Sequence, residues 1–183
     1  MRTFVAVTIQ PTGPLKRVLT QLGALGDSVR GVPPDNLHVT LKFLGETDNS
    51  DVVAACRILK DVAADASPLT LRLRGLGVFP RIERPNVVWA GLEQADPLIE
   101  LVSKFEDRFE ELGFPREVRA FHPHLTLVRV KRRPPQELFD LIERNAQHEF
   151  GTADVTQIEY FQSHLKREGA RYAVLATAKL TGD

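Results

Sequence analysis

Two segments of this chain carry side chains suited to acid–base chemistry. Residues 38–41 and 124–127 both read His-x-Thr-Leu, and each begins an apolar run rich in strand-forming residues. Because side chains alternate along a strand, the histidine and threonine of each copy share one face while the apolar residues occupy the other. We therefore expect two imidazoles, each with a hydroxyl beside it, to meet at one polar surface.

Such a pair of imidazoles is suited to chemistry at phosphorus. Free histidine has a pKa of about 6.5, so near neutral pH one of His38 and His124 can be neutral while the other is protonated. The neutral ring could take a proton from water, and the protonated ring could give one to a leaving oxygen, on opposite sides of phosphorus. The hydroxyls of Thr40 and Thr126 could donate to the non-bridging phosphate oxygens and stabilise the transition state without a metal. The motif pair predicts phosphodiester hydrolysis.

A substrate phosphate also needs positive charge. By alternation Lys42 shares the face of His38 and Thr40, so we expect its ammonium group at the site. Arg129 follows the second motif, but strict alternation places it on the face opposite His124. It reaches the site only where the strand carries a bulge or ends, and otherwise it is a surface arginine.

Aromatic residues on the expected strands are candidate platforms for a nucleobase, because bases stack on aromatic rings. Most strand aromatics belong to a core, so the core interpretation stays open for each of them. The candidates are Phe4, Phe43, Phe121, Tyr160 and Phe161.

A metal site is the main alternative. His122 and His124 would lie on one side of a regular strand, but Pro123 distorts it and no further ligand follows closely to complete a tetrahedral set. A thiol enzyme would have to use Cys56, which falls on an apolar helix face where a thiolate is disfavoured. The chain lacks a G-x-S-x-G elbow and the glycine-rich phosphate loops. We expect no metal and no cofactor.

The bulk composition indicates an ordinary globular protein. With 183 residues, 43% of them hydrophobic, we expect one domain over residues 1–183. Lys+Arg and Asp+Glu both total 24, and this zero net charge argues against a sequence-independent nucleic-acid coat. The single cysteine excludes an internal disulfide and suits a reducing compartment. No apolar stretch approaches the roughly 20 residues that span a bilayer, so we expect a cytoplasmic monomer with no membrane partner.

Periodicity predicts the elements that must position these residues. Apolar stripes of helical spacing predict helices at residues 15–25, 51–66, 97–112 and 136–145. Alternating or apolar runs predict strands at residues 3–9, 37–43, 69–76, 87–92, 121–130, 153–163 and 170–180, the last two joined by a turn at 166–169. Residues 80–85 indicate a charged loop. The fold class is therefore α+β and bilobal, with the two motif strands facing each other across a cleft.

Taken with the segments around them, the two motifs resemble those of the two-histidine phosphoesterases. Within that superfamily the chain is similar to the RNA 2′,3′-cyclic phosphodiesterases, historically named 2′-5′ RNA ligases. The similarity covers nearly the whole chain in order. It includes the opening strand 2–7, the first motif 36–46, the middle segments 73–80 and 88–92, the second motif 121–129, and a closing hairpin with Ser163, Lys166, Gly169 and Tyr172.

The resemblance implies two lobes of antiparallel sheet with outer helices, related by a pseudo-two-fold around a central cleft. It implies metal-independent hydrolysis of RNA 2′,3′-cyclic phosphate ends, or nucleoside 2′,3′-cyclic phosphates, to 2′-phosphates. In that reaction His38 would be the proton donor and His124 the proton acceptor, with Thr40, Thr126 and Arg129 holding the phosphate. The candidate substrate-binding residues are then Arg129, Lys42, Phe4, Ser163 and Lys166.

Two other functions stay open at this point. The same histidines could join RNA reversibly through a 2′-5′ linkage or cleave 2′-5′ oligonucleotides. The chain could also be an RNA-end binding module without catalysis. The loop at residues 81–85 and the basic stretch at residues 131–135 are both candidate guides for RNA into the cleft. We favour the second, because Lys131, Arg132 and Arg133 lie just past the second motif.

Overall fold

The computed structural model describes residues 1–167 and 169–182, which form four α-helices and two antiparallel sheets. The helices are α1 (Gly13–Gly23), α2 (Asn49–Ala64), α3 (Asp96–Glu111) and α4 (Gln136–Arg144). One sheet has the order β3 (His38–Glu46), β1 (Arg2–Thr8), β8 (Gln157–Lys166), β9 (Gly169–Lys179). The other has the order β2 (Val29–Gly31), β6 (His124–Val130), β5 (Arg84–Glu93), β4 (Leu69–Arg81), β7 (Glu149–Val155).

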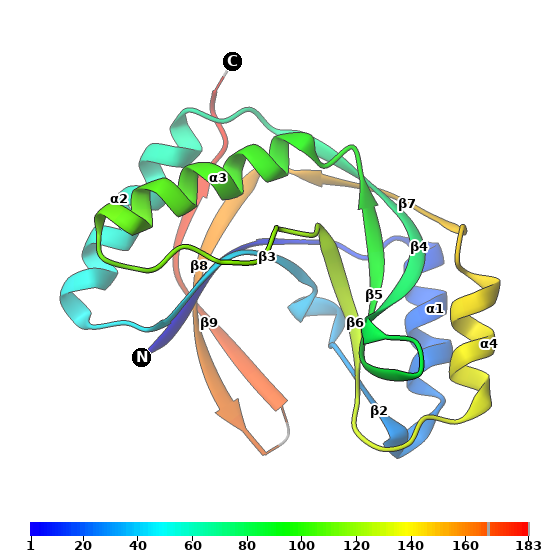
Figure 1. Cartoon of the computed structure of the whole chain (residues 1–183). Helices are drawn as coiled ribbons and strands as arrows, with labels where there is room; N and C mark the ends of the chain where they lie inside the picture. The colour runs from blue at the N-terminus through cyan, green and yellow to red at the C-terminus, as the bar shows by residue number, and fades with distance from the viewer. Residues whose placement is uncertain (168, 183) are drawn as a thin grey trace.

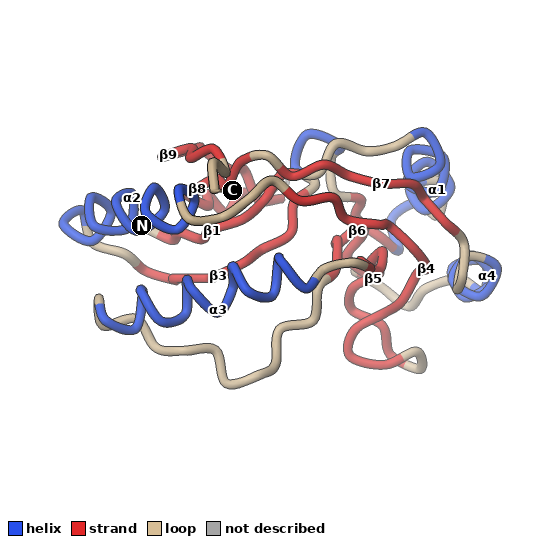
Figure 2. Tube along the Cα trace, turned by 90° about the horizontal axis from the view of Figure 1, so that it is seen from above, coloured by secondary structure: helices blue, strands red, loops and turns tan. Residues whose placement is uncertain are grey.

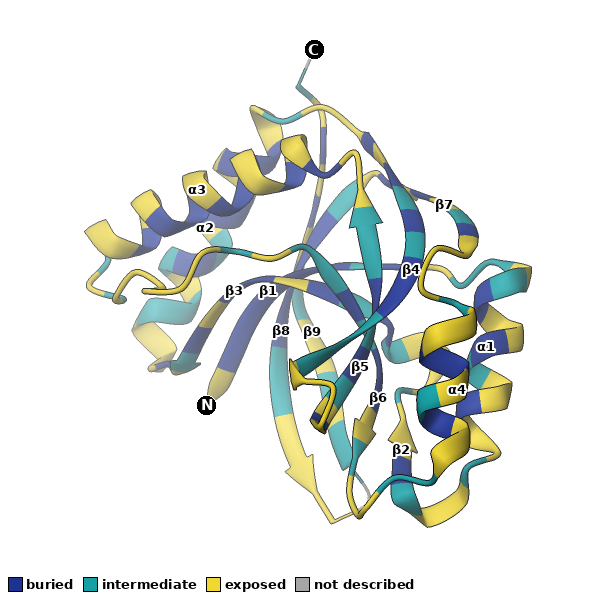
Figure 3. Cartoon of the chain, turned by 45° about the vertical axis from the view of Figure 1, so that its right-hand side comes forward, coloured by how far each residue is buried: buried dark blue, intermediate teal, exposed yellow. Residues whose placement is uncertain are grey.

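Each sheet is covered on its outer face by two helices. Helices α2 and α3 pack on the first sheet, and α1 and α4 lie beside the second (Figures 1 and 2). The helices bury one stripe and expose the other, as Figure 3 shows along α3 and α4. On α3 the buried stripe includes Leu98, Leu101 and Phe105, at the helical spacing read from the sequence. The two antiparallel sheets with outer helices confirm the predicted α+β fold.

The two sheets repeat one strand order around their motif strands. In the first sheet the motif strand β3 is followed by β1, β8 and β9; in the second the motif strand β6 is followed by β5, β4 and β7. The first sheet joins strands from both ends of the chain, so the two lobes are not the two halves of the sequence. This correspondence gives His38 and His124 equivalent starting positions on their strands.

A β-bulge follows the threonine of each motif. On β3, Thr40 pairs with Ala6 and Lys42 pairs with Val5, which leaves Leu41 as an extra residue. On β6, the pairing likewise moves from Thr126 to Val128 and skips Leu127. A bulge of this kind reverses the alternation of side chains beyond it.

The bulge on β3 makes the prediction for Lys42 wrong. Instead of sharing the face of His38, Lys42 lies on the opposite face and is only 4% exposed. Its ammonium nitrogen lies 2.6 Å from Oε2 of Glu106 on α3 and donates to the backbone carbonyl of Pro115 at 2.7 Å. Lys42 therefore ties α3 and the following loop to the sheet, and it is not a substrate-binding cation.

Three local predictions also differ from the structure. Residues 80–85 are not a loop, because β4 and β5 run to a two-residue turn at Ile82 and Glu83. Residues 153–163 belong to two strands separated at Thr156. Strand β2, only three residues long, carries too short a pattern to be read from sequence. In the turn predicted at 166–169, Glu168 lies outside the described residues.

The described α-helices are 9 to 16 residues long. None of them combines the length and apolar character that a membrane span requires.

Replacing Lys42 with methionine tests its structural role. Lys42→Met keeps most of the side-chain volume but leaves the buried Glu106 carboxylate without its cation, which costs about 3–5 kcal/mol. We expect the free energy of unfolding, measured in urea, to fall by about that amount. The matched variant Lys60→Met, at an exposed lysine of α2, should stay within about 0.5 kcal/mol of the parent protein. Equal losses in the two variants would contradict this role.

Candidate active site

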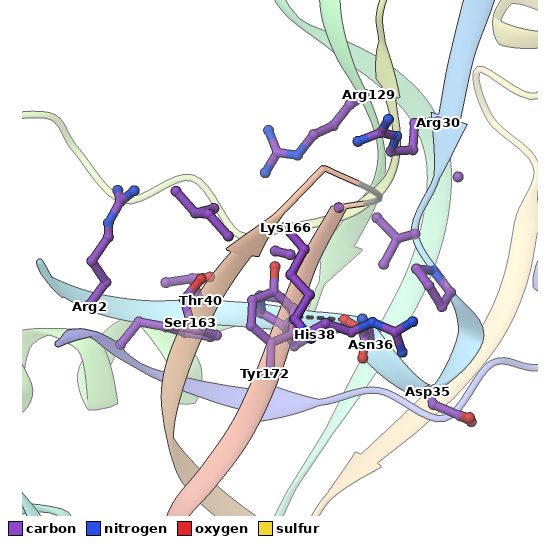
Figure 4. A pocket seen from close by; sticks show the side chains of 18 of the residues that line it. Arg2, Arg30, Asp35, Asn36, His38, Thr40, Arg129, Ser163, Lys166 and Tyr172 are labelled. Carbon is purple, nitrogen blue, oxygen red and sulfur yellow. Dashed lines mark hydrogen bonds between the residues drawn. The ribbon is translucent and has the colours of Figure 1, made fainter. Parts of the chain in front are cut away.

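A cleft of about 680 Å³ opens where the first sheet and its β8–β9 hairpin face strands β2 and β6. Figure 4 shows the side chains that converge on it from these separate parts of the chain. The lining includes His38, Thr40, Arg129, Ser163, Lys166 and Tyr172. The cleft thus gathers most of the residues that the sequence singled out.

The two histidines make the same hydrogen bond in their two lobes. The Nδ1 of His38 lies 2.6 Å from the backbone carbonyl of Asn36, and the Nδ1 of His124 lies 2.7 Å from that of His122. A carbonyl oxygen can only accept, so Nδ1 carries the proton in both rings. Nε2 is therefore left to accept a proton when the ring is neutral, or to donate one when it is protonated.

Aromatic rings hold each imidazole in place. The His38 ring lies 5.2 Å from Phe4 and 5.1 Å, edge to face, from Tyr172, measured between ring centroids. The His124 ring lies 4.9 Å from Phe79 and 6.4 Å from Trp89, both edge to face. Each ring is thus oriented by a carbonyl at one edge and by aromatic walls from its own sheet.

Burial lowers the pKa of His38 below its ordinary value, because the charged imidazolium loses solvent. The hydrogen bond to Asn36 acts in the opposite direction, the positive charge of Arg129 lowers the pKa further, and the negative charge of Glu159 raises it. Glu159 lies on β8, is 9% exposed, and accepts hydrogen bonds from the Thr8 hydroxyl and from the Gln157 amide at 3.1 Å. His38 is therefore set between a cation and a buried carboxylate.

The bulge on β6 brings Arg129 to the cleft. Beyond Leu127 the alternation is reversed, so Arg129 points to the same side as Thr126 and lines the cleft. Arg129 pairs with Arg30 of β2, and Figure 4 shows both side chains at the cleft. Within the described chain Arg129 forms no ion pair. Its charge is available to a phosphate, as the sequence prediction required.

Of the two motifs, only the first contributes its histidine and its threonine to the lining of the cleft. Thr40 lines the cavity, whereas His124 and Thr126 do not, although their strand β6 contacts β3. Among the residues that the structure describes, neither threonine hydroxyl has a hydrogen-bond partner in the protein. Both hydroxyls remain able to donate to a substrate.

The other residues that line the cleft include some that the sequence predicted and some that it did not. Phe4, Ser163 and Lys166 line the cleft, where the sequence expected them. Arg2 and Arg30 also line it and were not predicted. Arg30 lies on the three-residue strand β2, and no motif marks either arginine, so pattern alone offered no signal for them.

No three His, Cys, Asp or Glu side chains among residues 1–167 and 169–182 come together as a metal site.

Comparison with known proteins agrees with this architecture. The sequence profile of the 2′-5′ RNA ligase superfamily matches residues 11–166. An Archaeoglobus fulgidus RNA 2′,3′-cyclic phosphodiesterase is 33% identical over 94% of this chain and 96% of its own length. One from Aeropyrum pernix is 35% identical over 91% of this chain and 95% of its own.

Solved structures are similar over nearly the full length. A Thermus thermophilus crystal structure has a TM-score of 0.82 at 30% identity and covers 100% of both chains. Escherichia coli LigT complexed with 3′-AMP has a TM-score of 0.75 at 27% identity and covers 98% of both. Two antiparallel sheets with one His-x-Thr strand each define a two-histidine phosphoesterase. The chain belongs to the 2′-5′ RNA ligase superfamily, as the sequence resemblance predicted.

Two substitutions should move the pKa of His38 in opposite directions. Arg129→Ala removes a positive charge that disfavours the imidazolium, so the pKa should rise. Glu159→Gln removes a negative charge that favours it, so the pKa should fall. A pH titration of the His38 ring by NMR measures both shifts, with Lys16→Ala, at an exposed position outside the cleft, as the control. Shifts of the same sign in the two variants would contradict the electrostatic arrangement described here.

Proposed function

We propose that this protein hydrolyses the 2′,3′-cyclic phosphate at an RNA end to a 2′-phosphate, using its two motif histidines as a general acid and a general base. The observation that carries the proposal is the repeated Nδ1–carbonyl hydrogen bond, which leaves Nε2 of His38 and His124 free for proton transfer. Relatives named RNA 2′,3′-cyclic phosphodiesterases, over nearly the whole chain, support the reaction type.

In the proposed reaction a water oxygen attacks phosphorus while the bond from phosphorus to the 3′ oxygen breaks. Nε2 of His124 takes the proton of that water, and Nε2 of His38 gives its proton to the departing 3′ oxygen. The product carries the phosphate on its 2′ oxygen. Proton exchange with solvent then returns both histidines to their starting states.

The role of acid requires a protonated His38, although burial and Arg129 lower its pKa in the free protein. A bound phosphate diester is an anion, and beside Arg129 it offsets the positive charge that disfavours the imidazolium. Substrate binding therefore favours protonation of His38. The bound substrate thus favours the protonated His38 that a general acid requires. The negative charge of Glu159 favours the same protonated state.

The cleft offers groups for each part of a nucleotide. The Thr40 hydroxyl and the Arg129 guanidinium suit the non-bridging phosphate oxygens, where charge accumulates in the transition state. The Thr126 hydroxyl, on strand β6 beside the cleft, takes the same role in this proposal. On the other wall Tyr172 offers aromatic surface, beside Ser163 and Lys166. Phe4 is only 4% exposed and supports Tyr172 from behind, with their ring centroids 5.2 Å apart. The 3′-AMP, ATP and NADP⁺ complexes reported for Escherichia coli LigT support a nucleotide-sized ligand.

Removing either histidine should abolish turnover while the cleft stays intact. With a nucleoside 2′,3′-cyclic phosphate in EDTA, we expect His38→Ala and His124→Ala to lower kcat/KM by about 10²–10⁴-fold, the usual contribution of a positioned acid or base. His148→Ala, an exposed histidine outside the cleft, is the matched control and should retain full activity. The product should be the 2′-phosphate.

Three results would contradict the proposal. Activity that EDTA removes would point to metal-dependent chemistry. Activity that survives loss of both histidines would assign the reaction to other residues. RNA-end binding with no turnover by the parent protein would favour a binding module.

A further inference from the structure

We propose that a second, basic groove next to the cleft binds the RNA backbone upstream of the reacting end, so that the preferred substrates are oligonucleotides rather than mononucleotides. This inference rests on the proposed function. The basic groove is formed by residues 83–86 at the end of the β4–β5 hairpin, by Val130 at the end of β6 with residues 131–134 after it, and by Gln136 and Phe139 of α4. Its volume is about 750 Å³.

The basic groove is continuous with the cleft. Lys131 lines both cavities, and Arg129, two residues earlier, lines the cleft alone. In Figure 1 the chain leaves β6 and runs past the β4–β5 hairpin toward α4. Arg129, next to the last residue of β6, is followed by Lys131, Arg132 and Arg133, so cations succeed one another along the chain away from the cleft. An RNA strand whose end occupies the cleft can extend along this path.

Positive charge is concentrated along the path although the chain has no net charge. The groove has four cations, Arg84, Lys131, Arg132 and Arg133, and one acid, Glu83. The cleft adds Arg2, Arg30, Arg129, Lys166 and Arg171 against Asp35. Without a ligand these neighbouring positive charges repel one another, and a bound polyanion reduces that repulsion.

The basic groove cations are not neutralised by acids of the protein. In the described chain none of the four takes part in an ion pair. Some arginines elsewhere on the surface are paired: Arg72 contacts Glu93 and Glu149, and Arg116 contacts Asp107 and Glu110. Other exposed cations, such as Arg17, have no ion pair among the described residues, but they are not gathered in a groove. Glu83 is the one acid in the described lining of the groove and forms no ion pair with these cations, which leaves them available to phosphates.

The backbone of the groove is held in place before any ligand binds. The amides of Lys131 and Arg132 both donate to the carbonyl of Ser28, at 2.8 and 3.3 Å. Pro134 and Pro135 then restrict the chain up to the start of α4 at Gln136. A segment that is already ordered loses little conformational entropy on binding, which favours recognition of a ligand.

The shape of this surface favours a single RNA strand over other anions. The cations lie on two sides of a groove, with Arg84 on the hairpin facing the 131–133 segment, whereas a lipid surface is flat. Since the reacting group is a chain end in the adjoining cleft, the next phosphates of that chain are the anions closest to the groove. Single strands are bound in this way, by a positively charged groove that follows the backbone.

The test compares two substrates and two double variants. The substrates are a nucleoside 2′,3′-cyclic phosphate and a short RNA that ends in the same group. The groove variant is Arg132→Glu/Arg133→Glu, whose residues do not line the cleft. The control is Lys16→Glu/Arg17→Glu, an exposed pair on α1 with the same change in net charge and no place in either cavity.

We expect the groove variant to raise KM for the RNA about tenfold or more while kcat/KM for the mononucleotide stays unchanged. The salt dependence of RNA binding should weaken by about 0.7 in slope for each phosphate that the variant no longer neutralises. The control variant should behave as the parent protein does. Equal effects on both substrates, or equal effects of the groove and control variants on RNA, would overturn the inference.

Binding of the same RNA with an uncleavable 3′-hydroxyl end, measured by fluorescence anisotropy, separates this inference from the proposed function. Loss of affinity in the groove variant alone supports the groove even if the parent protein turns over no substrate. Unchanged RNA affinity overturns the inference even if the hydrolysis is established. Loss of binding to phosphatidylserine vesicles with unchanged RNA affinity would reassign the groove to a lipid surface.

Discussion

The bulge after each motif threonine is the constraint on which the site depends. Up to Thr40 and Thr126, ordinary strand alternation places histidine and threonine on one face. The extra residue then reverses the pattern. On β6 this turns Arg129 toward the cleft, where a regular strand would have pointed it away. On β3 the same device places Lys42 in the interior, where its ion pair with Glu106 joins α3 to the sheet. One backbone irregularity, used twice, therefore supplies both the cation of the site and an anchor of the fold.

The repeated geometry gives two equivalent histidines, and their surroundings make them different. Both rings donate from Nδ1 to a carbonyl two residues earlier, which fixes the same nitrogen for chemistry. His38 is nevertheless set between Arg129 and the buried Glu159, and its pKa responds to both. An acid and a base of the same residue type need such an asymmetry, because one must hold a proton while the other lacks it. In the proposed mechanism the anionic substrate, beside Arg129, counteracts the lowering of the His38 pKa and so favours the protonated ring that the acid role needs.

Residue pattern predicted those parts of the structure that depend on local periodicity. All four α-helices were expected within about two residues, because their apolar stripes are regular. The shared faces of His38 with Thr40 and of His124 with Thr126 followed from alternation alone. The bulges could not be located, since Leu-Lys and Leu-Val follow the two threonines and neither pair demands an irregular backbone. Arg30 and Glu159 reach the site through strand pairing across distant parts of the chain. Their roles depend on tertiary structure and not on neighbouring residues.

The central claim is that the two histidines act in opposite roles on either side of phosphorus, and replacing the 3′ bridging oxygen of the cyclic phosphate with sulfur tests it most directly. A thiolate leaves without protonation, so the sulfur substrate does not need the general acid. The account predicts that His38→Ala recovers most of its lost rate on this substrate, while His124→Ala remains as impaired as with oxygen. Equal impairment of both variants, or recovery of His124→Ala instead, would contradict the assignment of acid and base.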